Sequence, residues 1–174
     1  MMNHELVQAL NAQVNAEFYS AHLYLAMSTY AEQKGLKGAS KWLFAQFHEE
    51  MAHAIHMYNY ILDRGESVII SEVAAPVVEY ASIQEVFAKV LEHEQKVTAM
   101  INDIATLAMN HQDHACYQFI MWYVNEQVEE ESHVGDIISK LDLIGDNTGL
   151  MLALDAELGA RVFVNPFPTD AKTI

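Results

Sequence analysis

The chain has few of the residues that mark disulfide-rich or disordered proteins. Its 174 residues include one cysteine, Cys116, three prolines and seven glycines. A single cysteine excludes an intrachain disulfide and any zinc or iron–sulfur site built from several cysteine thiolates. The low proline and glycine content, with 52% apolar residues, excludes a disordered or collagen-like chain. This composition suits a packed helical protein.

Basic residues are also scarce, because nine Lys and Arg oppose 24 Asp and Glu, for a formal net charge of −15. A chain this acidic is not expected to bind nucleic acid or an anionic membrane, whereas it would attract cations. The same acidity would also arise in a protein that uses charge only to remain soluble. Charge alone therefore leaves both interpretations open.

No apolar stretch approaches the roughly 20 residues that cross a bilayer. The first residues lack a basic segment followed by a long apolar run, so they are not typical of a signal peptide. We therefore expect a cytoplasmic protein without a membrane partner. The length fits one domain with a sizeable core, and we predict a single domain over residues 1–174.

Apolar residues recur at three- and four-residue steps in four long segments. We predict helices over about residues 3–33, 39–64, 83–110 and 115–144, a short fifth helix over about 148–158, and an irregular tail over 159–174. Gly35 and Gly38 punctuate the first loop, and Gly65 follows the second helix where a C-cap favours glycine. Ser82 has Glu85 three residues later, which predicts an N-cap with a capping box.

Residues 66–81 look extended, and Pro76 within them stops a helix. A connection of roughly 16 residues at about 3.3 Å each reaches roughly 50 Å, whereas a helix of about 26 residues spans roughly 39 Å. The segment can therefore cross the whole length of a bundle, which makes the second and third helices parallel. The fold class expected is an all-α four-helix bundle with one long crossover and a short fifth helix.

Acidic side chains occupy the middle of each inner stripe. Glu17, Glu50, Glu94 and Glu130 each interrupt the apolar series of a different helix. One such residue is usually a boundary residue whose carboxylate reaches water, but four in four consecutive helices are not independent accidents. Buried together, they are very costly unless they share a cation. His53 lies three residues after Glu50 on the same helix face, so the two can bind one metal ion.

Mixed carboxylate and imidazole ligands suit Fe(II), Mn(II) and Zn(II) alike. The spacing of the inward residues is more specific. The chain contains Glu17, Tyr24, Glu49-Glu50-x-x-His53, Glu94 and Glu126-Gln127-x-Glu129-Glu130. This pattern resembles that of bacterial and archaeal non-haem ferritins over essentially the whole chain, and that of di-iron carboxylate bundles in general.

The resemblance implies that Glu17, Glu50 and His53 bind a first iron. Glu50 would bridge to a second iron, which Glu94 and Glu130 would hold.

The resemblance also implies neighbours for this pair. Gln127 would lie beside it as a hydrogen-bonding group or weak ligand, and Tyr24 would either hydrogen-bond near it or simply fill the core. Glu49, Glu126 and Glu129, together with Glu130, would form a third iron site, although Glu126 and Glu129, like Glu131, also suit a solvated helix face.

Histidine 133 departs from the non-haem pattern. Glu130-x-x-His133 repeats the Glu50-x-x-His53 spacing and is similar to the second such motif of bacterioferritins. The imidazole would either bind the second iron or lie beside the site, bonded to a carboxylate or to water. Other histidines lack inward companions and are predicted to be surface residues: His48, His56, His93, His111 and His114.

The resemblance implies an iron-storage subunit with ferroxidase activity. It would oxidise Fe(II) to Fe(III) with O₂ or H₂O₂ at a di-iron centre inside the subunit, and it would mineralise ferric iron within a hollow shell of 24 copies. Two alternatives remain open at this stage. One is a haem-binding, bacterioferritin-like variant that uses Met51, and the other is a non-enzymatic shell subunit that only nucleates mineral.

Overall fold

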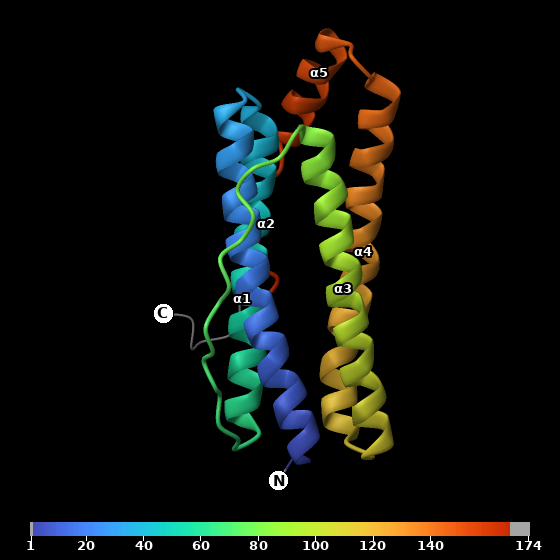
Figure 1. Cartoon of the computed structure of the whole chain (residues 1–174). Coiled ribbons are helices and arrows are strands. Elements are labelled where there is room, and N and C mark those ends of the chain that lie inside the picture. Colours follow the sequence, from blue (N-terminus) through green and yellow to red (C-terminus); the bar gives the residue numbers. More distant parts are fainter. Residues whose placement is uncertain (1, 168–174) are drawn as a thin grey trace.

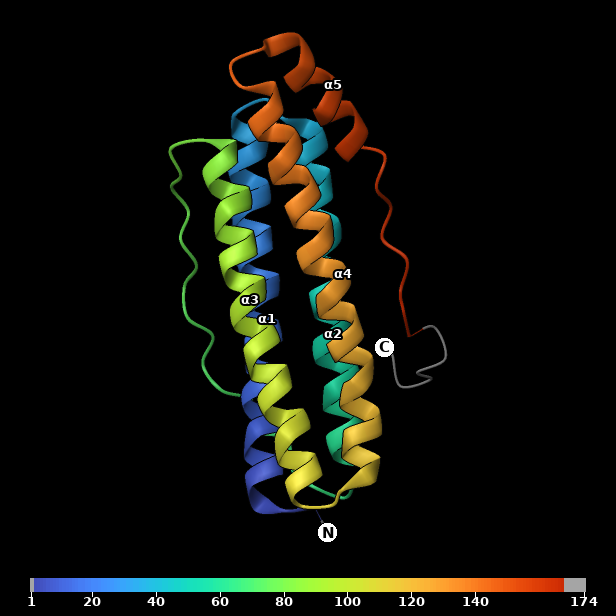
Figure 2. The same cartoon turned by 90° about the vertical axis from the view of Figure 1, so that its right-hand side faces the viewer.

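The computed structural model describes residues 2–167. The helices, in chain order, are α1 (His4–Gln33), α2 (Lys37–Asp63), α3 (Ile83–Asn110), α4 (His114–Ile144) and α5 (Thr148–Leu158). The four long helices lie side by side, and α5 lies across one end of them (Figures 1 and 2). The connection between α2 and α3 runs along the whole bundle, so these two helices are parallel (Figure 1). The all-α bundle with one long crossover is confirmed.

The ends of α2 and α3 follow the local signals in the sequence. The Ser82 side chain accepts a hydrogen bond from the Glu85 backbone N–H at 3.1 Å, and the Glu85 carboxylate accepts one from the Ala81 N–H at 2.6 Å. The predicted N-cap of α3 is confirmed. Gly65 follows the end of α2 with a φ of +75°, a conformation that favours glycine.

Helix α2 begins at Lys37, so the prediction that Gly38 belongs to the loop is wrong. The cause lies in α5, where the Asp155 carboxylate accepts hydrogen bonds from the Gly38 and Ala39 N–H groups at 3.0 and 2.8 Å. A Cβ on Gly38 would lie 1.6 Å from the Asp155 carbonyl oxygen. Gly38 therefore permits a close helix approach, while Gly35, with a φ of +80°, makes the turn.

The apolar core is divided into two clusters along the bundle axis. One lies toward α5 and includes Met27, Leu43, Phe87, Leu141 and Leu154. The other lies toward the opposite end and includes Leu6, Leu10, Ile61, Ile104 and Ile120. Between them, each long helix contributes buried polar side chains, so a polar layer crosses the middle of the bundle. No helix within residues 2–167 is long and apolar enough to cross a membrane.

Candidate metal centre

The polar layer contains the acids that were singled out in the sequence. The six side chains that the resemblance assigns to the buried pair of iron ions are each at most 4% exposed: Glu17, Glu50, His53, Glu94, Gln127 and Glu130. They come from all four long helices and from the middle of each one. The structure therefore brings the predicted ligands of both iron ions to one depth of the bundle.

Glu17, Glu50 and His53 form the tightest part of this layer. One ligand atom from each lies within 4.8 Å of the other two, a spacing that could hold a metal ion. His53 Nδ1 lies 3.6 Å from Glu50 Oε2, and within residues 2–167 His53 Nε2 has no hydrogen-bond partner. Buried polar atoms are normally satisfied, so a buried imidazole with one nitrogen 3.6 Å from a carboxylate and the other without a hydrogen-bond partner suits a bound cation.

Glu94 and Glu130 face this group from the other pair of helices. The Tyr24 hydroxyl donates to Glu94 Oε1 at 2.5 Å, and Gln127 Nε2 donates to Glu94 Oε2 at 3.0 Å. Gln46 Nε2 donates to Glu130 Oε2 at 2.9 Å. Tyr24 therefore does more than fill the core, because it donates to a carboxylate that the resemblance assigns to the second iron.

Two glutamines of this layer were missed in the sequence. Gln13 Nε2 donates to Glu17 Oε1 at 2.8 Å, and Gln46 holds Glu130 as described above. Both are fully buried, and each lies four residues before an inward glutamate of its own helix, Gln13 before Glu17 and Gln46 before Glu50. The repeated Gln-x-x-x-Glu spacing could have predicted both glutamines, since residues four apart share a helix face.

Burial makes the negative charge of this layer costly. Desolvation, followed by the neighbouring Glu50 carboxylate, raises the pKa of Glu17 well above its usual range. Desolvation and the charge of Glu94 do the same to the pKa of Glu50. The pKa of Glu94 rises to about 7, again through burial first and then through Glu130. A cation held between these groups would reverse the effect, because it favours the ionised carboxylates.

A second group of acids lies at the rim of the layer, on α2 and α4. The Glu49 and Glu126 side chains are 17% and 25% exposed, and Glu129 is exposed. Glu126 Oε1 lies 4.0 Å from His53 Nε2, so this rim adjoins the buried group. Burial raises the pKa of Glu49 to about 7, although an ion pair with Arg161 opposes the rise.

His133 is not brought into the buried layer. Its side chain is exposed, while that of the next residue, Val134, is fully buried. It lines a surface pocket together with Lys140, Glu157 and Arg161.

The prediction of surface positions is wrong for His56 and His93, both of which are partly buried. His56 Nδ1 lies within hydrogen-bond distance of the Tyr123 hydroxyl, at 3.0 Å, and His93 Nε2 lies 2.7 Å from the Ser20 hydroxyl. Burial lowers the pKa of His93 to about 4.

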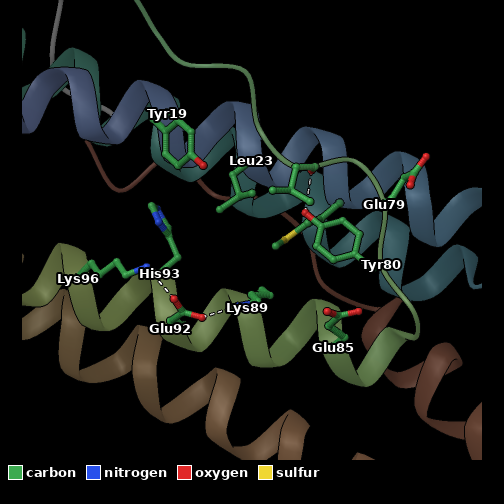
Figure 3. Close-up of a pocket in the computed structure, with 11 residues that line it drawn as sticks. Tyr19, Leu23, Glu79, Tyr80, Glu85, Lys89, Glu92, His93 and Lys96 are labelled. Carbon is green, nitrogen blue, oxygen red and sulfur yellow. Dashed lines mark hydrogen bonds and ion pairs between the residues drawn. The ribbon is translucent and has the colours of Figure 1, made fainter.

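His93 also lines a pocket of about 250 Å³ between α1, α3 and the crossover (Figure 3). Three glutamates line the pocket, Glu79, Glu85 and Glu92, and Glu92 pairs with Lys89 and Lys96 at 2.7 and 2.8 Å, as the dashed lines in Figure 3 show. None of the six buried side chains of the polar layer named above lines this pocket, so it is separate from the candidate metal centre.

Comparisons with known proteins agree with this geometry. A ferritin-like domain model matches residues 7–144. The chain is 39% identical to a bacterial non-heme ferritin of Staphylococcus epidermidis over 94% of its own length and 98% of the relative. It is 36% identical to a probable bacterial non-heme ferritin-like protein of Haemophilus influenzae, over 91% and 96%. An open pore ferritin of the archaeon Archaeoglobus fulgidus superimposes with a TM-score of 0.92 at 44% identity, over 93% and 100% of the two chains. The chain belongs to the ferritin family, as its resemblance to bacterial and archaeal non-haem ferritins predicts.

Proposed function

We propose that this chain is an iron-storage ferritin subunit that binds Fe(II) in the buried polar layer and oxidises it to Fe(III). The observation that carries the proposal is the Glu17, Glu50 and His53 group, whose ligand atoms lie within 4.8 Å of one another in the middle of the bundle. Glu94 and Glu130 face it from α3 and α4. Glu50 is proposed as the bridge between two iron ions, because it lies beside His53 and because, after burial, the charge of Glu94 is what raises its pKa most.

The surrounding side chains keep the ligands oriented. Tyr24 and Gln127 hold Glu94, Gln46 holds Glu130, and Gln13 holds Glu17. Such fixed partners reduce the reorganisation that metal binding requires. Anionic oxygen ligands favour Fe(III) over Fe(II), and an incompletely filled coordination shell leaves room for the oxidant.

Each Fe(II) gives up one electron. Two ions and two protons therefore convert O₂ into H₂O₂, or H₂O₂ into two molecules of water. Iron is the substrate and cargo of this reaction, so the ferric product has to leave the layer before the next pair can bind.

The rim acids could bind the ferric product after it leaves the buried layer. Glu49, Glu126 and Glu129, with Glu130, would form a third iron site at the exposed edge of the layer, next to His53. His133 is proposed as a neighbour of these acids rather than a ligand of the buried pair. Its exposed side chain supports a place outside the buried pair. A positive charge on His133 would also lower the pKa of Glu126 and so favour its ionised form.

The assembly that we propose is a shell of 24 copies. Helix α5 supports an oligomer because it docks on its own bundle through Leu154 and Leu158 but leaves Leu150 and Leu152 at 51% and 60% exposure. Neighbouring exposed leucines on one short helix are typical of an interface. A cytoplasmic location stays a prediction.

Stopped-flow absorbance tests the proposal. Two Fe(II) per subunit are added without oxygen, and oxygen is then admitted. We expect ferric absorbance to rise much faster than in buffer alone, and we expect no such rise with a variant that lacks the buried ligands. A rate equal to that of iron in buffer would favour the alternative of a shell that only nucleates mineral.

A further inference from the structure

The segment that follows α5 packs against the same face as the rim acids. Residues 161–167, here called the strap, leave α5 and run back along the bundle beside α2 and α4, on the side opposite to the crossover (Figure 2). Exposure along the strap alternates with a period of two. Its half-buried side chains are Arg161, Phe163, Asn165 and Phe167, and those between them are exposed. An extended segment shows this period when one side packs on a surface.

Arg161 anchors the beginning of the strap. Its guanidinium forms an ion pair with Glu49 of α2, and its Cζ lies 4.6 Å from the centre of the Trp42 ring. The side chain is 20% exposed. The ion pair and the cation–π contact each stabilise this position of the guanidinium. Arg161 is also the one charged residue of the strap.

Phe167 packs against α2 and α4 at the other end of the strap. Its ring stacks on His56 with the centroids 3.7 Å apart and lies 4.5 Å from Trp122. The His53 ring is 6.2 Å away. Between the two ends, Phe163 stacks on His48 at 5.4 Å. The strap therefore covers the edge of the polar layer at which His53 Nε2 meets Glu126.

We propose that the strap is a gate over the rim acids, and that Arg161 is an internal cation that a metal ion has to displace before it can bind there. The proposal rests on the third iron site proposed above. One positive charge already compensates Glu49, so the rim should bind metal more weakly than the buried layer. An ion of charge +2 or +3 attracts several carboxylates more strongly than one guanidinium does. It can therefore replace Arg161, which would lift the strap from Trp42.

Binding of Zn(II) tests this without any oxidation, because zinc accepts the same carboxylate and imidazole ligands. Calorimetric titration of the metal-free oligomer should show two tightly bound ions per subunit and a weaker third. In Arg161→Gln the third ion should bind about tenfold more tightly, equivalent to about 1.4 kcal/mol, while the first two are unchanged. Lys41→Gln is the matched control, since Lys41 binds the Gly159 carbonyl beside the strap but touches no rim acid.

Tryptophan fluorescence gives a second readout, because both tryptophans of the chain contact the strap. The third zinc ion should change the emission of the wild type and of Lys41→Gln as Arg161 leaves the Trp42 ring. In Arg161→Gln no guanidinium contacts the Trp42 ring, so the emission of this variant should differ from that of the wild type before zinc is added.

Two results would overturn the gate while leaving the proposed function intact. One is a third ion that binds equally well to the wild type and to Arg161→Gln, with two tight ions in both. The other is two tight ions with no third ion in either protein. Failure of the wild type to bind two ions tightly would instead overturn the proposed function, and the gate with it.

Discussion

At the scale of single residues, the buried glutamates set the behaviour of the centre. Glu50 of α2 has His53 Nδ1 3.6 Å away, and after burial the charge of Glu94 on α3 is what raises its pKa most. Without a cation, each ionised carboxylate of the layer raises the cost of ionising the others. The same groups therefore destabilise the metal-free protein and would be stabilised by a bound cation.

Removal of Glu50 separates these two effects. We expect Glu50→Ala to reduce rapid Fe(II) oxidation to the rate in buffer, because the proposed bridge would be lost from both iron ions. The metal-free fold should keep its stability or gain some, since loss of a buried charge that has no counter-ion is not destabilising. Stopped-flow absorbance and thermal unfolding measure the two quantities. Glu72→Ala, which removes an exposed acid of the crossover, should match the wild type, and wild-type oxidation in Glu50→Ala would rule out the assignment.

The raised pKa values also predict how pH acts on the metal-free protein. The Glu94 pKa rises from 4.5 to about 7, so the folded state binds more protons than the unfolded state between these values. Stability then falls as pH rises through this window. We expect a lower melting temperature at pH 8 than at pH 5, because the free energy of unfolding falls by about a few kcal/mol between them.

Added Zn(II) should reverse that order, because it binds the ionised carboxylates. Glu94→Gln should flatten the dependence of the melting temperature on pH, and Glu72→Gln should leave it unchanged. A metal-free protein that melts at a higher temperature at pH 8 than at pH 5 would contradict the electrostatic account.

At the scale of helices, local patterns and distant contacts differ in how far the sequence reveals them. The Ser82 and Glu85 cap and the Gly65 turn depend on neighbours within a few residues, so they could be predicted. The inner stripes predicted the acidic layer for a similar reason, because helix geometry alone puts residues three or four apart on one face. The cap that Asp155 provides for α2 joins residues 117 positions apart, and no local pattern predicts it.

The strap shows the same limit. Its alternation of half-buried and exposed side chains follows from packing against α2 and α4, with Arg161 reaching Glu49 across 112 positions. Two valines and two phenylalanines in seven residues do not by themselves indicate which surface of the bundle the segment packs against. The sequence therefore predicts the candidate metal ligands but not the segment that covers the edge of their layer.

Asp155 offers a test of how far α5 stabilises the bundle. Asp155→Ala removes two hydrogen bonds to the first turn of α2. Loss of a helix cap costs about 1–2 kcal/mol, which corresponds to roughly 2–8 °C in a chain of this size. Differential scanning calorimetry measures the shift. Asp146→Ala, in the exposed turn before α5, should melt within about a degree of the wild type, and equal melting of both variants would show that α5 adds nothing to α2.

At the scale of the whole molecule, α5 has two different faces. Leu154 and Leu158 are buried against the end of the bundle, whereas Leu150 and Leu152 remain exposed. The net charge of −15 opposes close packing of many copies. An assembly therefore needs apolar contacts that outweigh this repulsion, and the exposed side of α5 is one source of them.

We expect the wild type to form a large closed oligomer and the double variant Leu150→Glu and Leu152→Glu to form smaller species. The two charges would lie in an apolar interface without partners, which costs several kcal/mol per contact. Light scattering coupled to size-exclusion chromatography at micromolar concentration measures the mass. Thr148→Glu puts a charge on the same helix without removing apolar surface, and it should keep the wild-type mass. The bundle itself should stay helical in the double variant, because Leu154 and Leu158 still dock α5. A wild type that is monomeric or dimeric would contradict the shell, and a double variant of wild-type mass would place the interface away from α5.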